Sequence, residues 1–147
     1  MMAILAGGLL CGVLDITAAF LTWAPYGVTP ERVLQSVASG ALGRRSFEGG
    51  WETAALGALF HFTIAFVAAS VFYFASLGIA TLTERPILSG IAYGVCVYAV
   101  MYWVVVPLSR VTPRPFSLRN TVIAILTHIV CVGLPIATMV RRYRAAR

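Results

Sequence analysis

Residues 121–138 read TVIAILTHIVCVGLPIAT and are apolar enough to cross a bilayer as a helix, although His128 lies near their middle. Spacings of three and four place one set of small or polar residues on a single helix face. These residues are Thr121, Ala124, His128, Cys131, Pro135 and Thr138. Membrane helices pack against protein through their small residues. We therefore expect His128 to face other helices and the large aliphatic residues to face lipid.

The composition extends this interpretation to the whole chain. Of its 147 residues, 60% are hydrophobic and 11% are charged, whereas a soluble domain is roughly half apolar and about a quarter charged. Four stretches are long enough to span about 30 Å of hydrocarbon as helices. They are residues 3–23, 54–80, 88–107 and 120–140. We predict an all-α membrane protein with a single domain, a four-helix transmembrane bundle over residues 1–147.

The segment between the first two spans carries signals for an additional helix. Thr29 suits the N-cap, Pro30 the first helical position and Glu31 the first turn. Apolar residues then repeat on one face until Gly43, which can end a helix. The pattern predicts an amphipathic, interfacial helix over residues 30–42. Aromatic residues suited to anchor the bundle at the membrane interface are Trp23, Tyr26, Trp51, Tyr102 and Trp103.

The basic residues bear on partners and orientation. The net charge of +6 comes from arginine alone, and in a membrane protein such charge favours contact with lipid headgroups rather than nucleic acid. Five arginines fall on the side of the termini and six on the other, which gives no bias. The arginines directly after the last span favour an orientation with both termini in the cytoplasm. The first span lacks a basic leader and a small-residue cleavage site, so we expect it to be retained.

Three ionisable residues fall inside the predicted spans, namely Asp15, His61 and His128. Counted from the same membrane face, each lies seven or eight residues into its helix, which places all three about 10–12 Å deep. Each also shares a face with small residues, and turning a charge to lipid is costly. Tyr98 continues the small-residue face of the third span at about the same depth. We predict a polar cluster of Asp15, His61, His128 and Tyr98.

Three kinds of chemistry remain open for this cluster. The first is purely structural, with hydrogen bonds that fix helix register and no cofactor. The second is a ligand site, in which His61 and His128 hold a b-type haem, or Asp15, His61 and His128 hold a transition metal. The third is proton or ion handling by the titrating side chains.

Catalysis by a nucleophile is not indicated. Cys131 lies one turn beyond His128 with no other base in reach, and the cysteines form no CxxC pair. Arg114 lies in a stiff segment with two prolines, from which it either contacts headgroups or folds back towards Asp15. No phosphate-binding motif is present. We therefore predict a protein that is not an enzyme.

Several motifs together resemble a known family. They are PERV at residues 30–33, HFTIAFVAA at 61–69, VVVPLSRVTPRPFSL at 104–118 and THIVCVGLPIATMVRR at 127–142. This arrangement resembles the YagU-like (DUF1440-type) bacterial inner-membrane proteins, and His61 and His128 match histidines of that family. The resemblance implies a small polytopic plasma-membrane protein with cytoplasmic termini. It implies no mechanism, and the first loop is shorter here.

The sequence leaves three functions open. The first is a non-enzymatic accessory or scaffold subunit of a membrane complex. Such a subunit would bind other membrane subunits or a second copy through its GxxxG faces. These faces are formed by Gly8 with Gly12 and by Gly90 with Gly94. The second is a haem- or metal-binding membrane protein that uses His61 and His128. The third is a small proton or ion conduit.

Overall fold

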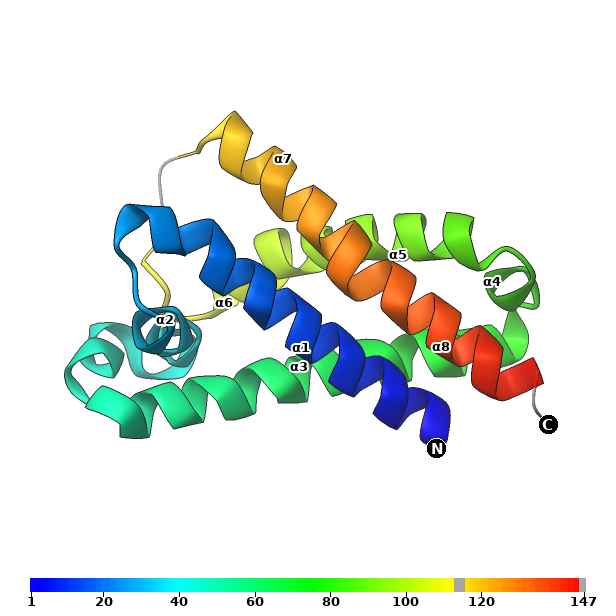
Figure 1. The fold of residues 1–147 in the computed structure, drawn as a ribbon, viewed down its shortest axis with the longest axis horizontal. Helices are drawn as coiled ribbons and strands as arrows, with labels where there is room; N and C mark the ends of the chain where they lie inside the picture. Colours follow the sequence, from blue (N-terminus) through cyan, green and yellow to red (C-terminus); the bar gives the residue numbers. More distant parts are fainter. Residues whose placement is uncertain (113–115, 146–147) are drawn as a thin grey trace.

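The computed structural model describes residues 1–112 and 116–145, in which four long apolar helical segments form a bundle (Figure 1). These segments are Met2–Tyr26, Gly50–Gly78, Pro86–Leu108 and Leu118–Arg144. Each is long and apolar enough to cross a membrane, and the described residues include no strand. The predicted all-α four-helix architecture is confirmed, and the chain is a membrane protein.

The helices within these segments follow one another with short breaks. In chain order they are α1 (Met2–Trp23), η1 (Ala24–Tyr26), α2 (Pro30–Leu42), η2 (Gly43–Glu48), α3 (Gly50–Gly78), α4 (Thr81–Glu84), α5 (Pro86–Val100), η3 (Met101–Val105), α6 (Val106–Leu108), α7 (Leu118–Thr127), η4 (His128–Gly133) and α8 (Leu134–Ala145). Both termini and α4 lie at one end of the bundle, and α2 and α6 lie at the other (Figure 1). We call these the terminal end and the α2 end.

Helix α2 begins where its capping signals predict. Thr29 Oγ1 accepts a hydrogen bond from the Arg32 amide at 3.3 Å, and Pro30 is the first helical residue. The helix ends at Gly43, whose φ of +61° suits glycine. Its buried face packs on α3 at Gly57, where an added Cβ would lie 2.7 Å from the Leu34 carbonyl carbon. The amphipathic helix α2 therefore packs with its buried face directly against α3.

Removal of this cap gives a first test of how α2 is held. Thr29→Ala deletes the side-chain acceptor for the Arg32 amide, which should cost about 1 kcal/mol. Hydrogen exchange of the α2 amides should then be roughly fivefold faster. The matched control is Thr17→Ala, because the Thr17 hydroxyl bonds only to Val13 O of its own helix. Unchanged exchange in α2 would show that the cap does not hold the helix.

Close packing of the third and fourth spans depends on glycine. A Cβ added at Gly94 would lie 2.5 Å from Ile129 Cα, and one at Gly133 would lie 2.6 Å from Gly94 N. Gly90 faces Leu134 in the same way, with 2.9 Å from its added Cβ to Leu134 Cα. The backbones of α5 and η4 thus meet directly. The Gly90/Gly94 pair, predicted as a surface for partners, is occupied within the chain.

The glycine pair of the first span is used similarly. Gly8 and Gly12 are buried, and an added Cβ at Gly12 would lie 2.7 Å from the ring of Phe62 on α3. The ring of Phe66 covers Gly8. Both GxxxG faces therefore serve packing inside the bundle, which corrects the expectation that they are open to other subunits.

Two spans contain a widened, π-helical turn. η3 and η4 are π-helical, and each precedes a proline, Pro107 or Pro135. Proline lacks the amide hydrogen of an α-helical ladder, and wide turns of this kind occur where the ladder is interrupted. The turn at η4 also changes which residues face the bundle interior. Beyond His128 the buried residues no longer follow the spacing of a regular α-helix.

The shift can be followed residue by residue along the fourth span. Val132 is 6% exposed and Ile136 is 0% exposed. Cys131 is only half-buried and Thr138 is exposed. Of the residues predicted on the inner face beyond His128, Pro135 is buried, whereas the prediction is wrong for Thr138 and holds only in part for Cys131, because a π turn takes more than 3.6 residues.

The hydrophobic core fills the terminal end of the bundle. The core residues Ala69, Phe72, Ile136 and Val140 are at most 1% exposed. At its edge, Arg144 donates hydrogen bonds to the carbonyl and the hydroxyl of Ser76, which joins α8 to the end of α3. Dense packing at this end contrasts with a hollow at the α2 end.

Candidate functional site

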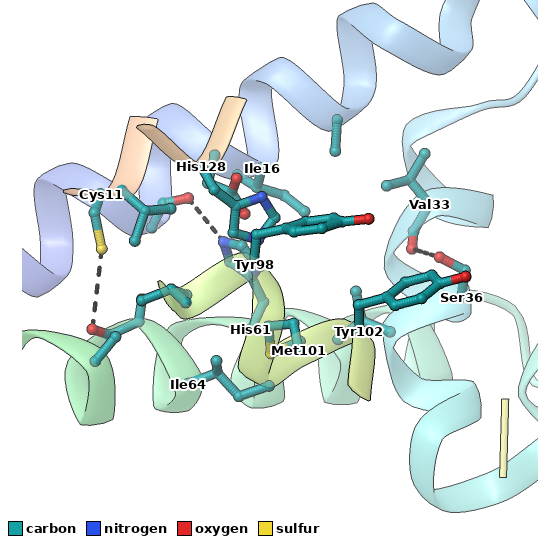
Figure 2. A pocket seen from close by; sticks show the side chains of 18 of the residues that line it. Cys11, Ile16, Val33, Ser36, His61, Ile64, Tyr98, Met101, Tyr102 and His128 are labelled. Atoms are coloured by element: carbon teal, nitrogen blue, oxygen red, sulfur yellow. Dashed lines mark hydrogen bonds between the residues drawn. The ribbon is translucent and has the colours of Figure 1, made fainter. Parts of the chain in front are cut away.

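A cavity of about 340 Å³ lies inside the bundle at its α2 end. Its wall comes from all four spans and from α2, which contributes Val33, Ser36 and Val37. Figure 2 shows this cavity with His61 on α3 and His128 on η4 near Tyr98. Most of the wall is apolar, with few polar groups, which is typical of small-molecule sites.

The cavity brings together the residues that equal depth and small-residue faces predict. Asp15, His61, Tyr98 and His128 all line it, each from a different span. Their side chains are all partly buried. The sequence pattern thus located a site from three ionisable residues and one tyrosine that are distant in sequence.

Asp15 is the acidic group of this site. It lies on α1, one turn after Gly12 and two turns before Trp23, and all three residues line the cavity. Its carboxylate has no hydrogen bond or ion pair with any residue of the described ranges. A carboxylate inside a membrane span normally pairs with another group, so this side chain is free to take a proton or a cation.

His61 joins the second span to the first. Its Nε2 lies 2.8 Å from Gly12 O. Since a carbonyl oxygen only accepts hydrogen bonds, Nε2 carries the proton and donates. In the neutral ring Nδ1 then keeps its lone pair. The Gly12 carbonyl that accepts this bond lies one turn before Asp15. His61 is therefore held beside the segment of α1 that carries Asp15.

His128 is held by its own helix. Its Nδ1 donates to Ala124 O at 2.8 Å, which leaves the lone pair of the neutral ring on Nε2. The ring also meets Tyr98 edge-on, with 5.7 Å between ring centroids and 76° between planes. His128 is the first residue of the π-helical turn. Widened turns of this kind are frequent at functional sites.

Aromatic rings form one wall of the cavity. Tyr98 and Tyr102 are stacked, with 5.8 Å between centroids and 18° between planes. Both line the cavity, as does Trp23, and Figure 2 shows the two tyrosines extending towards the side on which α2 lies. Tyr102 and Trp23 had been expected at the membrane interface. The four-residue spacing of Gly90, Gly94, Tyr98 and Tyr102 was the signal that places Tyr102 on this wall.

The predicted metal centre is not formed. Within residues 1–112 and 116–145, no group of three or more His, Cys, Asp or Glu side chains is placed to hold a metal ion. Asp15, His61 and His128 share the cavity without converging on one point. His61 Nε2 and His128 Nδ1 each donate to a backbone carbonyl, and the other nitrogen of each ring keeps its lone pair. These hydrogen bonds are compatible with ligation, so axial ligation of a b-type haem by this pair stays a prediction.

Cys131 and Arg114 are the remaining candidate residues of the sequence analysis. Cys131 is half-buried and is not among the residues of the cavity wall. Cys11 does line the cavity, and its Sγ donates weakly to Ala65 O at 3.9 Å. Arg114, predicted either to contact headgroups or to reach Asp15, lies outside the described residues.

Comparisons of the chain with protein-family models, with curated proteins and with solved structures found no match. The resemblance to YagU-like proteins therefore stays a prediction based on the sequence motifs.

Proposed function

We propose that this protein handles protons in the bacterial inner membrane, and that Asp15 binds and releases the proton inside the bundle cavity. The observation that carries the proposal is the Asp15 carboxylate, which lines a cavity within the spans and has no partner among the described residues. A charged aspartate at the middle of a membrane helix costs about 2.5–3.5 kcal/mol on insertion scales. Protonation removes that charge, so Asp15 has a physical reason to exchange protons there.

His61 and His128 support this role as neutral neighbours. Each donates one ring N–H to a backbone carbonyl and keeps one lone pair. The nitrogen that keeps its lone pair can accept a proton from a neighbouring group. Both rings line the same cavity as Asp15, and a proton can pass between such groups directly or through water.

The cavity lies at one end of the bundle. Trp23 and α2 border the cavity at the α2 end, whereas Phe72, Ile136 and Val140 fill the terminal end. With both termini in the cytoplasm, as we propose, the cavity lies towards the periplasmic side. This arrangement favours a carrier that is accessible from one side at a time over a continuous conduit.

The other two predicted functions have less support. An accessory subunit would bind partners through GxxxG faces that pack inside the chain, so other subunits or a second copy would need another surface. For a metal carrier, the described residues place no group of three or more His, Cys, Asp or Glu side chains to hold an ion. Proton handling needs no group beyond those that line the cavity.

Infrared spectroscopy of the protein in lipid nanodiscs tests the proposal directly. The carbonyl stretch of a protonated carboxylic acid in an apolar site should appear in acidic buffer and vanish in alkaline buffer. Asp15→Asn should remove this band completely, because Asp15 is the only acidic side chain among the described residues that line the cavity. Glu84→Gln, an exposed residue of α4, is the matched control and should retain the band. Persistence of the band in Asp15→Asn would refute the proposal.

A further inference from the structure

We infer that the cavity binds a small organic cation in exchange for the Asp15 proton. This inference rests on the proposed proton site and adds the class of molecule that replaces the proton. It combines three features of the same cavity, namely an unpaired carboxylate, a wall of aromatic rings and a shortage of other polar groups.

The charge of the cavity is the first feature. Among the described residues that line it, Asp15 is the only acidic side chain and none is arginine. When Asp15 releases its proton, the cavity therefore holds a negative charge that no described side chain neutralises. A positively charged ligand restores neutrality in the low-dielectric interior, where an uncompensated charge is most costly.

The aromatic wall is the second feature. Tyr98 and Tyr102 are stacked, and Trp23 lines the cavity with them. The faces of tyrosine and tryptophan rings attract ammonium groups, and quaternary ammonium ligands are commonly bound between such rings. A carboxylate together with aromatic faces is thus a combination suited to an organic cation.

The apolar remainder of the wall excludes a metal ion as the occupant. Ca²⁺ takes six to eight oxygen ligands and Mg²⁺ about six, whereas this cavity offers one carboxylate. The side chains of Ile16, Ile64 and Val97 also line it, and they suit the hydrocarbon substituents of an organic cation. A volume of about 340 Å³ lies at the small end of the range for ligand cavities, which favours a compact molecule.

The exchange is balanced without a redox step. The O–H bond of protonated Asp15 breaks, the proton leaves to water, and the cation takes its place beside the carboxylate. Several titratable groups face Asp15 in this cavity or act on it from nearby: Cys11, His61, Tyr98, Tyr102, His128 and Cys131. Protonation of Asp15 removes the attraction, and protonation of either histidine adds repulsion. Acid therefore weakens cation binding in both ways.

Calorimetric titration of the full-length protein in nanodiscs tests the inference. The probe is benzyltrimethylammonium, and the control ligand is neopentylbenzene, which has the same shape and no charge. We expect the cation to bind in alkaline buffer and to lose at least about tenfold in affinity in acidic buffer in which the Asp15 infrared band is present. Neopentylbenzene should show no such pH dependence.

Variants assign the binding to the proposed residues. Asp15→Asn should weaken cation binding at least about tenfold, and Asp15→Glu, which keeps the charge, should restore it. Tyr102→Leu should weaken binding by about threefold to thirtyfold, whereas Tyr98→Phe, which keeps its ring, should stay within about twofold of the wild type. Glu84→Gln should bind like the wild type.

The outcomes separate this inference from the proposed function. If the Asp15 infrared band titrates but benzyltrimethylammonium does not bind, the cation inference is wrong and the proton site stands. Equal binding of the charged and neutral probes, unaffected by Asp15→Asn, would likewise overturn the inference. If Asp15→Asn leaves the infrared band in place, the proton site itself is refuted.

Discussion

Gly133→Ala is expected to lower the free energy of unfolding by about 1–3 kcal/mol, the usual cost of overpacking. The added Cβ would lie 2.6 Å from Gly94 N and 2.9 Å from Gly94 Cα. Both are backbone atoms, so no side-chain rotation can relieve the clash, and η4 must move away from α5. Unfolding with increasing fractions of sodium dodecyl sulfate, followed by circular dichroism, measures the loss.

A second glycine provides the control for this substitution. An added Cβ at Gly78, at the end of α3, would meet no atom within 4 Å. Gly78→Ala should therefore unfold like the wild type or slightly later, because alanine reduces the freedom of the unfolded chain. If Gly133→Ala also unfolds like the wild type, direct backbone contact between the two spans does not hold the bundle together.

The effect should extend to the cavity, since these helices carry part of its wall. Tyr98 follows Gly94 on α5, and His128 precedes Gly133 on η4. Separation of the backbones would pull the edge contact between these two rings apart. The glycines at the crossing thus position the site as well as stabilise the fold.

Much of the architecture follows from the sequence for simple physical reasons. Long apolar stretches must form helices in a bilayer, because every backbone polar group there needs an internal partner. Helix α2 begins at Pro30 because Thr29 supplies its cap and proline fits the first turn. These effects are local, so a short stretch of sequence is enough to predict them.

The place of the candidate site could also be predicted. Helix rise converts residue counts into depth, and small-residue faces indicate which sides pack together. These two rules bring Asp15, His61, Tyr98 and His128 to one cavity. They do not give the direction of each polar atom. The bond from His61 Nε2 to Gly12 O depends on how closely α1 approaches α3, and residue counts do not give that distance.

The π-helical turns mark the other limit of sequence reasoning. An α-helical period assigned Cys131 and Thr138 to the inner face, whereas Val132 and Ile136 occupy it. Pro135 follows the turn η4, and whether a proline causes a kink or a widened turn depends on its neighbours. Here the backbone of α5 lies directly against η4 at Gly133. Packing against a second helix therefore contributes to the shape of the turn.

Gly57→Ala is expected to open the cavity by displacing α2. The added Cβ would lie 2.7 Å from the Leu34 carbonyl carbon and 3.3 Å from Ala38 N. These are backbone atoms of α2, and Ala38 is fully buried at this contact. Because Val33 and Ser36 of the same helix line the cavity, a shift of α2 must change access to Asp15.

A cysteine at Ser36 reports this opening. The variant Ser36→Cys is made in a chain in which Cys11, Cys96 and Cys131 are replaced by serine. Its thiol should react with a charged thiol reagent about tenfold faster when Gly57→Ala is added. This factor corresponds to a loss of about 1.4 kcal/mol of local stability when α2 is displaced. Gly78→Ala on the same helix should leave the rate unchanged. An unchanged rate with Gly57→Ala would mean that α2 does not control entry. Faster labelling together with faster proton exchange at the Asp15 infrared band would show that protons reach the cavity from the α2 end, because the core at the terminal end is untouched by this substitution.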